Sequence, residues 1–144
     1  MKLPAFFSDS MVLQRDSRLP LWGWDRPGQS VTVSVAGHSG RATTDATGRW
    51  AVELGPFEAG GPIEMLIEGS ESVVIHNVLI VEVWLCSGQS NMQMIVKQCE
   101  GAQDDLAAAD WPEVRFFHVT QETAFAPRAD VTGRWNGCTP QTAS

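Results

Sequence analysis

The sequence predicts an antiparallel β-sandwich over residues 1–80, followed by the beginning of an α/β fold over residues 81–144. Two observations support this mixed fold class. Up to about residue 80, short runs of alternating apolar and polar residues are separated by turns rich in glycine and proline, as in all-β sandwiches. After residue 80, a continuous apolar run is followed by helix-compatible segments and another strand-like run, which is the order of a β-α-β unit.

The period-two alternation is clearest in three runs of the first part. In each of them every second residue is apolar: Val31, Val33 and Val35; Trp50, Val52 and Leu54; Ile63, Met65 and Ile67. Because successive side chains of a strand point to opposite faces, each run places its apolar residues on one face of a sheet. Turns are expected at residues 26–28, 37–40, 45–48 and 55–62, and no helix signal lies between them.

The second part begins with residues 78–86, which are apolar at nearly every position. Such continuity is typical of a strand that is buried on both faces, as parallel sheets require. Residues 92–98 and 103–110 are expected to form short helices, and residues 113–120 to return as a strand beside the first one. About 65 residues cannot complete an α/β sandwich, so we expect a parallel edge and apolar faces to remain uncovered.

The turn Ser87-Gly88-Gln89-Ser90-Asn91 joins the expected strand to the first expected helix. This arrangement lifts a nucleophilic serine out of a sheet and directs backbone N–H groups, with the partial positive charge of the helix N-terminus, at an oxyanion. Ser90 also fits a structural role, because residues 90–93 match a capping box. The run differs from the Gly-x-Ser-x-Gly elbow of α/β-hydrolases, since Met92 stands at the position of the second glycine.

The run Gly88-Gln89-Ser90-Asn91-Met92 resembles the first conserved block of the SGNH (GDSL-like) serine esterases, in the form typical of the sialate O-acetylesterase family. Other segments are similar to that family too: Leu3 to Asp9, Met11 to Arg15, Leu21 to Trp24, Gly48 to Trp50, Glu82 to Cys86 and Gly133 to Trp135. Because the resemblance covers essentially the whole sequence in order, we identify the chain as the N-terminal portion of a member of this family.

The resemblance implies a β-sandwich followed by the first β-α-β part of an SGNH-type α/β sandwich. It also implies a hydrolase that removes O-acetyl groups from sialic acid or related sugars through an acetyl-enzyme. Ser90 would be the nucleophile, and its own backbone N–H would donate to the oxyanion; Gly88, Gln89, Asn91 and Met92 would position and pack this block. The family's other catalytic groups, a glycine, an asparagine and a final Asp-x-x-His, lie further downstream than residue 144.

None of the three histidines is expected to act as the general base for Ser90. His38 lies in an expected turn, His76 interrupts a strand-like run and is expected on the surface, and His118 closes the last expected strand. A hydroxyl without a base at hydrogen-bond distance is a poor nucleophile. We therefore expect the isolated chain to be inactive, and the missing C-terminal catalytic part to be supplied in cis or in trans.

Composition argues against several classes of partner. A net charge of −7 disfavours nucleic acid and anionic membranes, and no apolar run approaches the ~20 residues of a membrane span. No cluster of residues has metal-ligand spacing, so neither a metal nor another cofactor is expected. The three cysteines form no CxxC pair, and Cys86 is expected in the core. Without a signal-peptide pattern the chain is expected to be cytoplasmic, or secreted or periplasmic if a leader was omitted.

The alternative function is a non-catalytic β-sandwich module that packs against a separate catalytic part or presents sugar to it. The six tryptophans could stack on an O-acetylated sugar, although Trp22, Trp24 and Trp50 fall where strand cores or turn packing would place them. The carboxylates of Asp104 and Asp105 are expected at a solvated helix start, where they complement the helix dipole. The source of the missing Asp and His separates the two functions.

Overall fold

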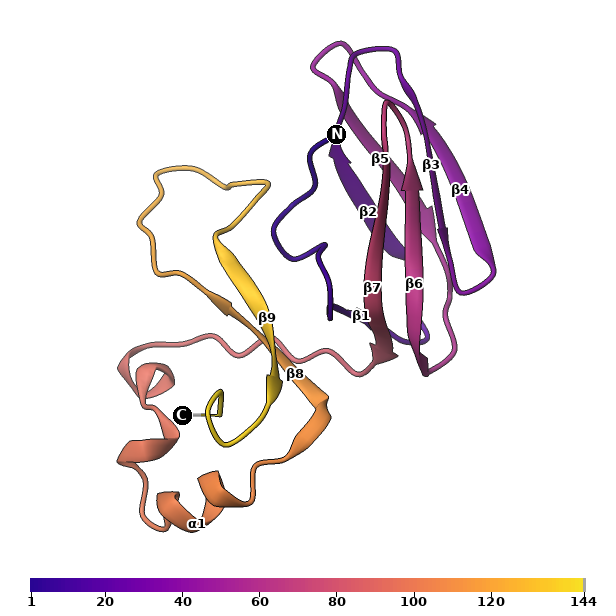
Figure 1. The fold of residues 1–144 in the computed structure, drawn as a ribbon. Helices are drawn as coiled ribbons and strands as arrows, with labels where there is room; N and C mark the ends of the chain where they lie inside the picture. Colours follow the sequence, from indigo (N-terminus) through magenta and orange to yellow (C-terminus); the bar gives the residue numbers. More distant parts are fainter. Residues whose placement is uncertain (144) are drawn as a thin grey trace.

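The computed structural model describes residues 1–143 and consists mainly of strands in three sheets (Figure 1). The first 81 residues contain β1 (Val12–Gln14), β2 (Leu19–Trp24), β3 (Ser30–Val35), β4 (His38–Thr43), β5 (Arg49–Leu54), β6 (Gly60–Glu68) and β7 (Ser72–Val81). The remaining residues contain the 3-10 helices η1 (Ser90–Gln93) and η2 (Val96–Gln98), the helix α1 (Ala102–Ala107), and β8 (Trp111–Val119) and β9 (Gly133–Cys138). The expectation of a mixed fold is confirmed at this level, with strands predominating over helices.

Strands β1 to β7 form two sheets that enclose one core. The larger sheet has the order β1-β7-β6-β3-β4, and β2 pairs with β5 in the smaller sheet. All of these pairs are antiparallel except β1 and β7, which run parallel. Side chains of both sheets meet in a single hydrophobic cluster, and Figure 1 shows the smaller sheet lying across the larger one.

The predicted alternation of apolar residues accounts for this core. Every second residue of β3 and β5 is buried, and the buried residues are the predicted ones: Val31, Val33, Val35, Trp50, Val52 and Leu54. In β6, Met65 and Ile67 are buried, whereas Ile63 packs at the margin of the cluster. Full burial of a side chain of this size contributes about 1.5–3 kcal/mol, so these strands define where the core lies.

Residues 82–110, which we call the Ser90 segment, differ in part from the sequence prediction. The expected strand over residues 78–86 stops at Val81, and residues 82–89 have no regular structure. The parallel partner β1 also ends there, with Gln14 opposite Val81, and a backbone without ladder partners does not form a strand. Cys86, expected in the core, is exposed for the same reason.

The expected helices of the Ser90 segment are shorter than predicted. Residues 92–98 form parts of the two 3-10 helices rather than one α-helix, because Met94 and Ile95 between them have left the helical conformation. The second expected helix is present as α1, which begins at Ala102 and has both predicted carboxylates, Asp104 and Asp105, in its first turn.

The strand expected over residues 113–120 is present as β8, but its partner differs from the prediction. It pairs antiparallel with β9 and not parallel with the strand before Ser90. One face of this β8–β9 pair packs on the sandwich: Phe117 lies edge-to-face against Trp135 and Phe6, and Trp135 Nε1 donates to the Phe6 carbonyl at 2.8 Å. The Ser90 segment therefore leaves the sandwich after β7 and returns to it at β8.

The loop before β9 is bound to the N-terminal residues through Asp130. Its Oδ1 accepts the backbone N–H groups of Ala5 and Val131, each at 2.9 Å, and its Oδ2 lies 3.2 Å from Lys2 Nζ. Partial burial acts to raise the pKa of Asp130, but these hydrogen bonds and the charge of Lys2 outweigh it, so the pKa lies below its ordinary value.

Two neighbouring residues of β7 test the core assignment. Ile75 is 2% exposed and Val74 is 40% exposed, because they point to opposite faces of the sheet. Ile75→Ala is expected to lower the free energy of unfolding by about 2–5 kcal/mol, and Val74→Ala by less than about 1 kcal/mol. Urea unfolding of both variants measures the difference; equal losses would contradict the assigned core.

Asp130→Asn tests the contact between the loop and the N-terminus. Because the folded-state pKa is lowered, the ionised carboxylate stabilises the fold above the unfolded pKa of about 4, and this contribution disappears as pH falls through the folded pKa. The variant is expected to be about 1 kcal/mol less stable at pH 7, and the difference from the parent should vanish in acid. Asp110→Asn is the control, and a difference that persists unchanged below pH ~3 would contradict this origin.

Candidate active site

Ser90 is the first residue of η1, on an exposed turn of the Ser90 segment. Gln89 precedes it in an extended conformation, and the turn closes with hydrogen bonds from Met92 N–H to the Gln89 carbonyl at 2.9 Å and from Met94 N–H to the Asn91 carbonyl at 3.3 Å. The expected strand-turn-helix arrangement is thus present only in its turn. A single 3-10 turn stands in place of the helix.

The hydroxyl of Ser90 is not occupied by a capping contact. Gln89 holds the N-cap position of η1, and no side chain caps this helix. Within residues 1–143, the Ser90 hydroxyl takes part in no hydrogen bond. The capping-box interpretation is therefore wrong for this structure, and the hydroxyl is exposed on the surface.

Gly88 and Met92 lie against each other across the turn. A Cβ atom at position 88 would lie 2.6 Å from Met92 Cγ, which is closer than real Cβ contacts come. The absence of a side chain at Gly88 lets Met92 fold back over the turn that carries Ser90. Gln89 and Asn91 share this exposed turn on either side of Ser90.

No general base accompanies Ser90 among the described residues. His38 begins β4 and packs its ring edge-to-face on Phe57, and His76 Nδ1 on β7 lies 2.9 Å from Glu64 Oε1. His118 lies on β8 and lines a cavity that contains no residue of the 88–92 block. Among residues 1–143, no group of three or more His, Cys, Asp or Glu side chains could hold a metal ion.

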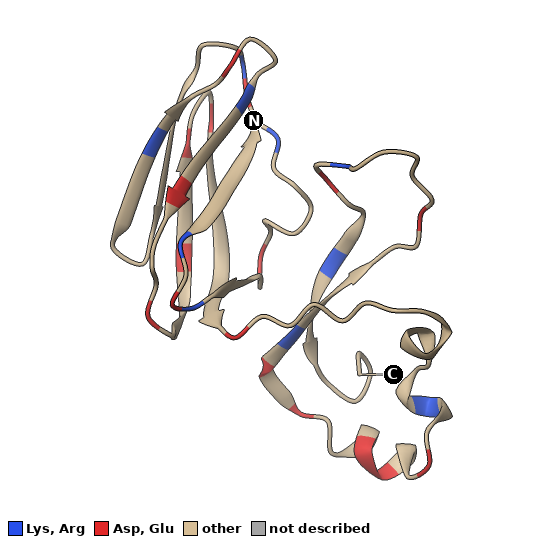
Figure 2. Cartoon of the chain, turned by 180° about the vertical axis from the view of Figure 1, so that it is seen from behind, with Lys and Arg blue, Asp and Glu red and all other residues tan. Residues whose placement is uncertain are grey.

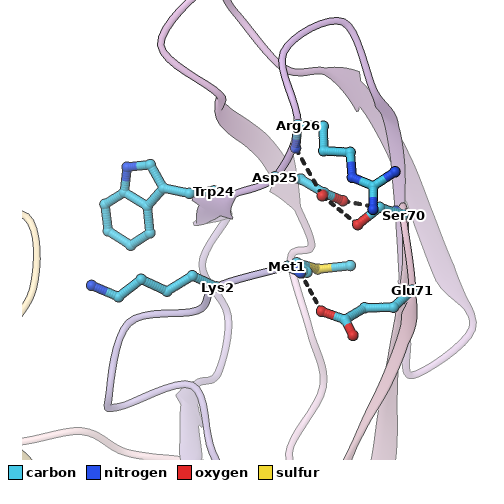
Figure 3. Close-up of a pocket in the computed structure, with 7 residues that line it drawn as sticks. All are labelled: Met1, Lys2, Trp24, Asp25, Arg26, Ser70 and Glu71. Atoms are coloured by element: carbon cyan, nitrogen blue, oxygen red, sulfur yellow. Dashed lines mark hydrogen bonds and ion pairs between the residues drawn. The ribbon is translucent and has the colours of Figure 1, made fainter.

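Neither of two open cavities on the surface of residues 1–143 includes the Ser90 turn. One, of about 520 Å³, lies on the face of the β8–β9 pair that points away from the sandwich, and its lining includes Phe116, His118, Arg134 and Asn136. The other, of about 450 Å³, lies beside the N-terminus (Figure 3) and is lined by Met1, Lys2, Trp24, Asp25, Arg26, Ser70 and Glu71. Sequence reasoning located neither: Trp24 and Arg134 lie in segments that resemble the family, but nothing in those segments indicated a cavity.

Two charged side chains of the N-terminal cavity, those of Asp25 and Lys2, already have partners in the fold. Asp25 accepts the backbone N–H groups of Arg26 and Ser70, each at 2.8 Å. These bonds and the Ser70 hydroxyl outweigh the effect of partial burial, so the pKa of Asp25 is lowered. Lys2 Nζ lies 5.0 Å from the centre of the Trp24 ring.

The tryptophans considered for sugar stacking have packing roles in the sandwich. Trp50 is buried in the core, and Trp22 lies edge-to-face against both Phe6 and Phe7. Lys2 occupies one face of Trp24. Stacking of a sugar on these three rings therefore has no support in the structure.

The Ser90 segment carries most of the exposed apolar side chains. Of the first 81 residues only Val74 is a large hydrophobic residue that is exposed, whereas the Ser90 segment exposes Val83, Trp84, Leu85, Met92, Met94, Ile95 and Val96. No charged residue occurs between Glu82 and Lys97. In Figure 2 this stretch is the tan chain that leads away from the sandwich. Exposed apolar side chains gathered in one segment in this way are typical of an interface.

Comparisons with known proteins agree on one class of enzyme. No family model matches the sequence. The sialate O-acetylesterases of Mus musculus and Rattus norvegicus are 34% and 35% identical to it, over 83% and 92% of this chain. The chain spans about a quarter of the length of these relatives, 24% and 27% respectively. A crystal structure of a carbohydrate acetylesterase from Xanthomonas citri is similar to this chain, with a TM-score of 0.93 and 36% sequence identity. The match covers 98% of this chain and 33% of the Xanthomonas citri chain.

Proposed function

We propose that this chain, which belongs to the sialate O-acetylesterase family through about a quarter of the length of its relatives, carries the nucleophile of a carbohydrate O-acetylesterase. The observation that supports this proposal most strongly is the similarity of nearly the whole chain, in sequence and in backbone, to enzymes named for this activity. The substrate would be an O-acetylated sugar, with sialic acid as the first candidate.

In the proposed reaction the Ser90 Oγ attacks the acetyl carbonyl and gives its proton to a base; the bond between the acetyl carbon and the sugar oxygen then breaks, and the sugar oxygen takes up that proton and leaves as a hydroxyl. Water then hydrolyses the acetyl-enzyme and releases acetate. The backbone N–H of Ser90 would donate to the oxyanion of both tetrahedral intermediates. The unoccupied hydroxyl on an exposed turn supports the nucleophile assignment, and the contact of Gly88 with Met92 supports a packing role for these two residues.

The general base would come from residues outside 1–143, either in the same polypeptide or in a second chain. The exposed apolar side chains around Trp84 and Ile95 support the presence of such additional residues, because burying exposed apolar side chains is favourable. Under this proposal residues 83–86 become a strand buried on both faces. Residues 81–144 would then begin an SGNH-type α/β sandwich, and residues 1–80 would form the β-sandwich domain beside it.

The second candidate function is a β-sandwich module without catalysis of its own. The lack of a base beside Ser90 within the described residues favours it. In that case a separate catalytic protein would act on the sugar, and Ser90 would have no chemical role.

Ser90→Ala tests the nucleophile in the protein as its source organism produces it. Release of acetate from O-acetylated sialic acid is expected to fall at least about a thousandfold, because the acetyl-enzyme cannot form. Ser87→Ala, on the same exposed segment, is the matched control and should retain most of the activity. Melting temperatures of both variants should match the parent; turnover by Ser90→Ala near the parent rate would refute the assignment.

The 144-residue chain by itself is expected to hydrolyse 4-nitrophenyl acetate no faster than its own Ser90→Ala variant. The reason is that no described side chain can take the proton of the Ser90 hydroxyl. Initial rates of the two proteins, measured side by side, provide the comparison. A rate that depends on Ser90 would show that a base is already present in this chain.

A further inference from the structure

We propose that Gln14 and Arg115 are positioning residues for Ser90, which fix the Ser90 segment to the β-sandwich where it leaves and where it returns. Their relevance to catalysis rests on the proposed function. Neither residue belongs to the Gly88–Met92 block, and both act through backbone groups of other residues. Both positions are defined by the hydrogen bonds they make.

Gln14 extends the β1–β7 ladder beyond the end of β1. The last backbone contact of this ladder is the Arg15 N–H donating to the Val81 carbonyl at 3.0 Å, and the chain then turns away at Asp16, which has a φ of 55°. The Gln14 side-chain amide takes the place of the missing peptide group. Its Oε1 accepts the Val83 N–H at 2.8 Å, so one further residue of the departing chain has a ladder partner.

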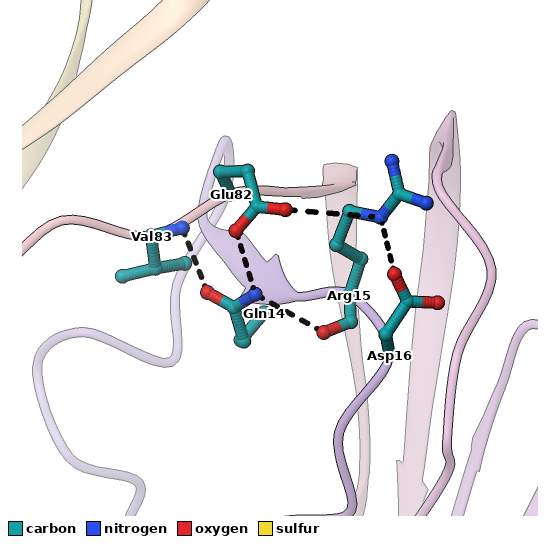
Figure 4. Close-up of polar contacts among 5 residues, drawn as sticks. All are labelled: Gln14, Arg15, Asp16, Glu82 and Val83. Carbon is teal, nitrogen blue, oxygen red and sulfur yellow. Dashed lines mark hydrogen bonds and ion pairs between the residues drawn. The ribbon is translucent and has the colours of Figure 1, made fainter.

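The other end of the same amide binds the side chain of the departing segment. Gln14 Nε2 donates to Glu82 Oε2 at 3.0 Å and to the Arg15 carbonyl at 3.1 Å, as the close-up in Figure 4 shows. Arg15 Nε lies 3.9 Å from the second Glu82 oxygen and 2.7 Å from Asp16. One glutamine therefore contacts both the backbone and a side chain at residues 82–83, and this sets the direction in which the chain runs toward Ser90.

Arg115 makes the corresponding contact where the chain returns. Its Nη1 donates to the Ser10 carbonyl at 3.1 Å and also to the Asn77 carbonyl, and its Nη2 donates to Asn77 Oδ1 at 2.8 Å. Ser10 and Asn77 both have positive φ, 67° and 58°, and Asn77 Nδ2 donates to Ser10 Oγ at 3.0 Å. The planar guanidinium fits this fixed group of acceptors, which an ammonium group cannot match.

The contacts of Arg115 and Gln14 lie at opposite ends of β1. Ser10 precedes this short strand and Gln14 is its last residue, so the same piece of the sandwich holds the departing and the returning chain. Fixing both ends of a segment limits the space that its middle can sample. A nucleophile misplaced by about 1 Å can lose about a hundredfold in rate, which is why these contacts are expected to affect kcat.

The test combines Gln14→Leu and Arg115→Lys with two control substitutions on the sandwich. Gln29→Leu and Arg41→Lys are the controls, because these side chains make only single local contacts, at 3.2 Å to the Ser30 carbonyl and 3.4 Å to Thr32. Amide hydrogen exchange of the 144-residue chain reports on the segment itself. Kinetics of the source protein with O-acetylated sialic acid report on catalysis.

Gln14→Leu is expected to increase exchange of the Val83 amide, whose N–H donates to Gln14 Oε1, by roughly tenfold, and Arg115→Lys to increase exchange at the start of β8. In the source protein both are expected to lower kcat by about tenfold or more, with KM within about twofold of the parent. Lysine keeps the positive charge of Arg115 but lacks its planar fork, so a loss in Arg115→Lys would be due to the geometry of the guanidinium group and not to its charge.

Exchange and kcat equal to those of the controls would overturn the proposal. A raised KM with an unchanged kcat would also overturn it, because that would indicate lost substrate binding and not lost positioning. If the source protein had no activity that depends on Ser90, the proposed function would fail. The exchange result would then still decide whether Gln14 and Arg115 fix this segment.

Discussion

A strand persists only as far as its backbone groups find partners, and this constraint governs the structure from β7 onward. The β-sandwich meets it throughout, since each of its strands has a neighbour in the ladder, and all of them except β4 place buried apolar side chains in the common core. At Val81 the partner strand β1 ends, and the following residues lose regular structure although their side chains favour a strand. The form of the Ser90 segment follows from this loss.

The same constraint explains why polar side chains gather where the Ser90 segment joins the sandwich. An amide or guanidinium group can satisfy backbone groups that no strand reaches, and Gln14 and Arg115 do so at the two junctions. Between these junctions lie an uncharged apolar stretch and a serine with an unoccupied hydroxyl. The well-packed sandwich thus carries a segment whose apolar side chains find no partners among the described residues.

The sequence was sufficient where information is local. Alternation located the buried residues of β3, β5 and β6, and turn residues separated these strands, because both depend on near neighbours. The pairing of strands depends on residues that are far apart in the sequence. For this reason neither the early end of β7 nor the antiparallel pairing of β8 with β9 could be predicted. Ser90 was singled out by the expected strand-turn-helix arrangement and then by the family resemblance, and its role remains a prediction. Arg115 carried no signal, since an arginine beside a strand is an ordinary surface residue, and Gln14 lay in the Met11–Arg15 segment that resembles the family without any role being indicated for it.

The most direct test of the central claim is covalent labelling of the source protein with a fluorophosphonate, followed by peptide mass spectrometry. Such a probe phosphonylates a serine that a base has activated. The account predicts a label on Ser90 and its loss when an O-acetylated sugar is present in excess. A label on another serine, or none on a protein that still releases acetate, would contradict the assignment of Ser90 as the nucleophile.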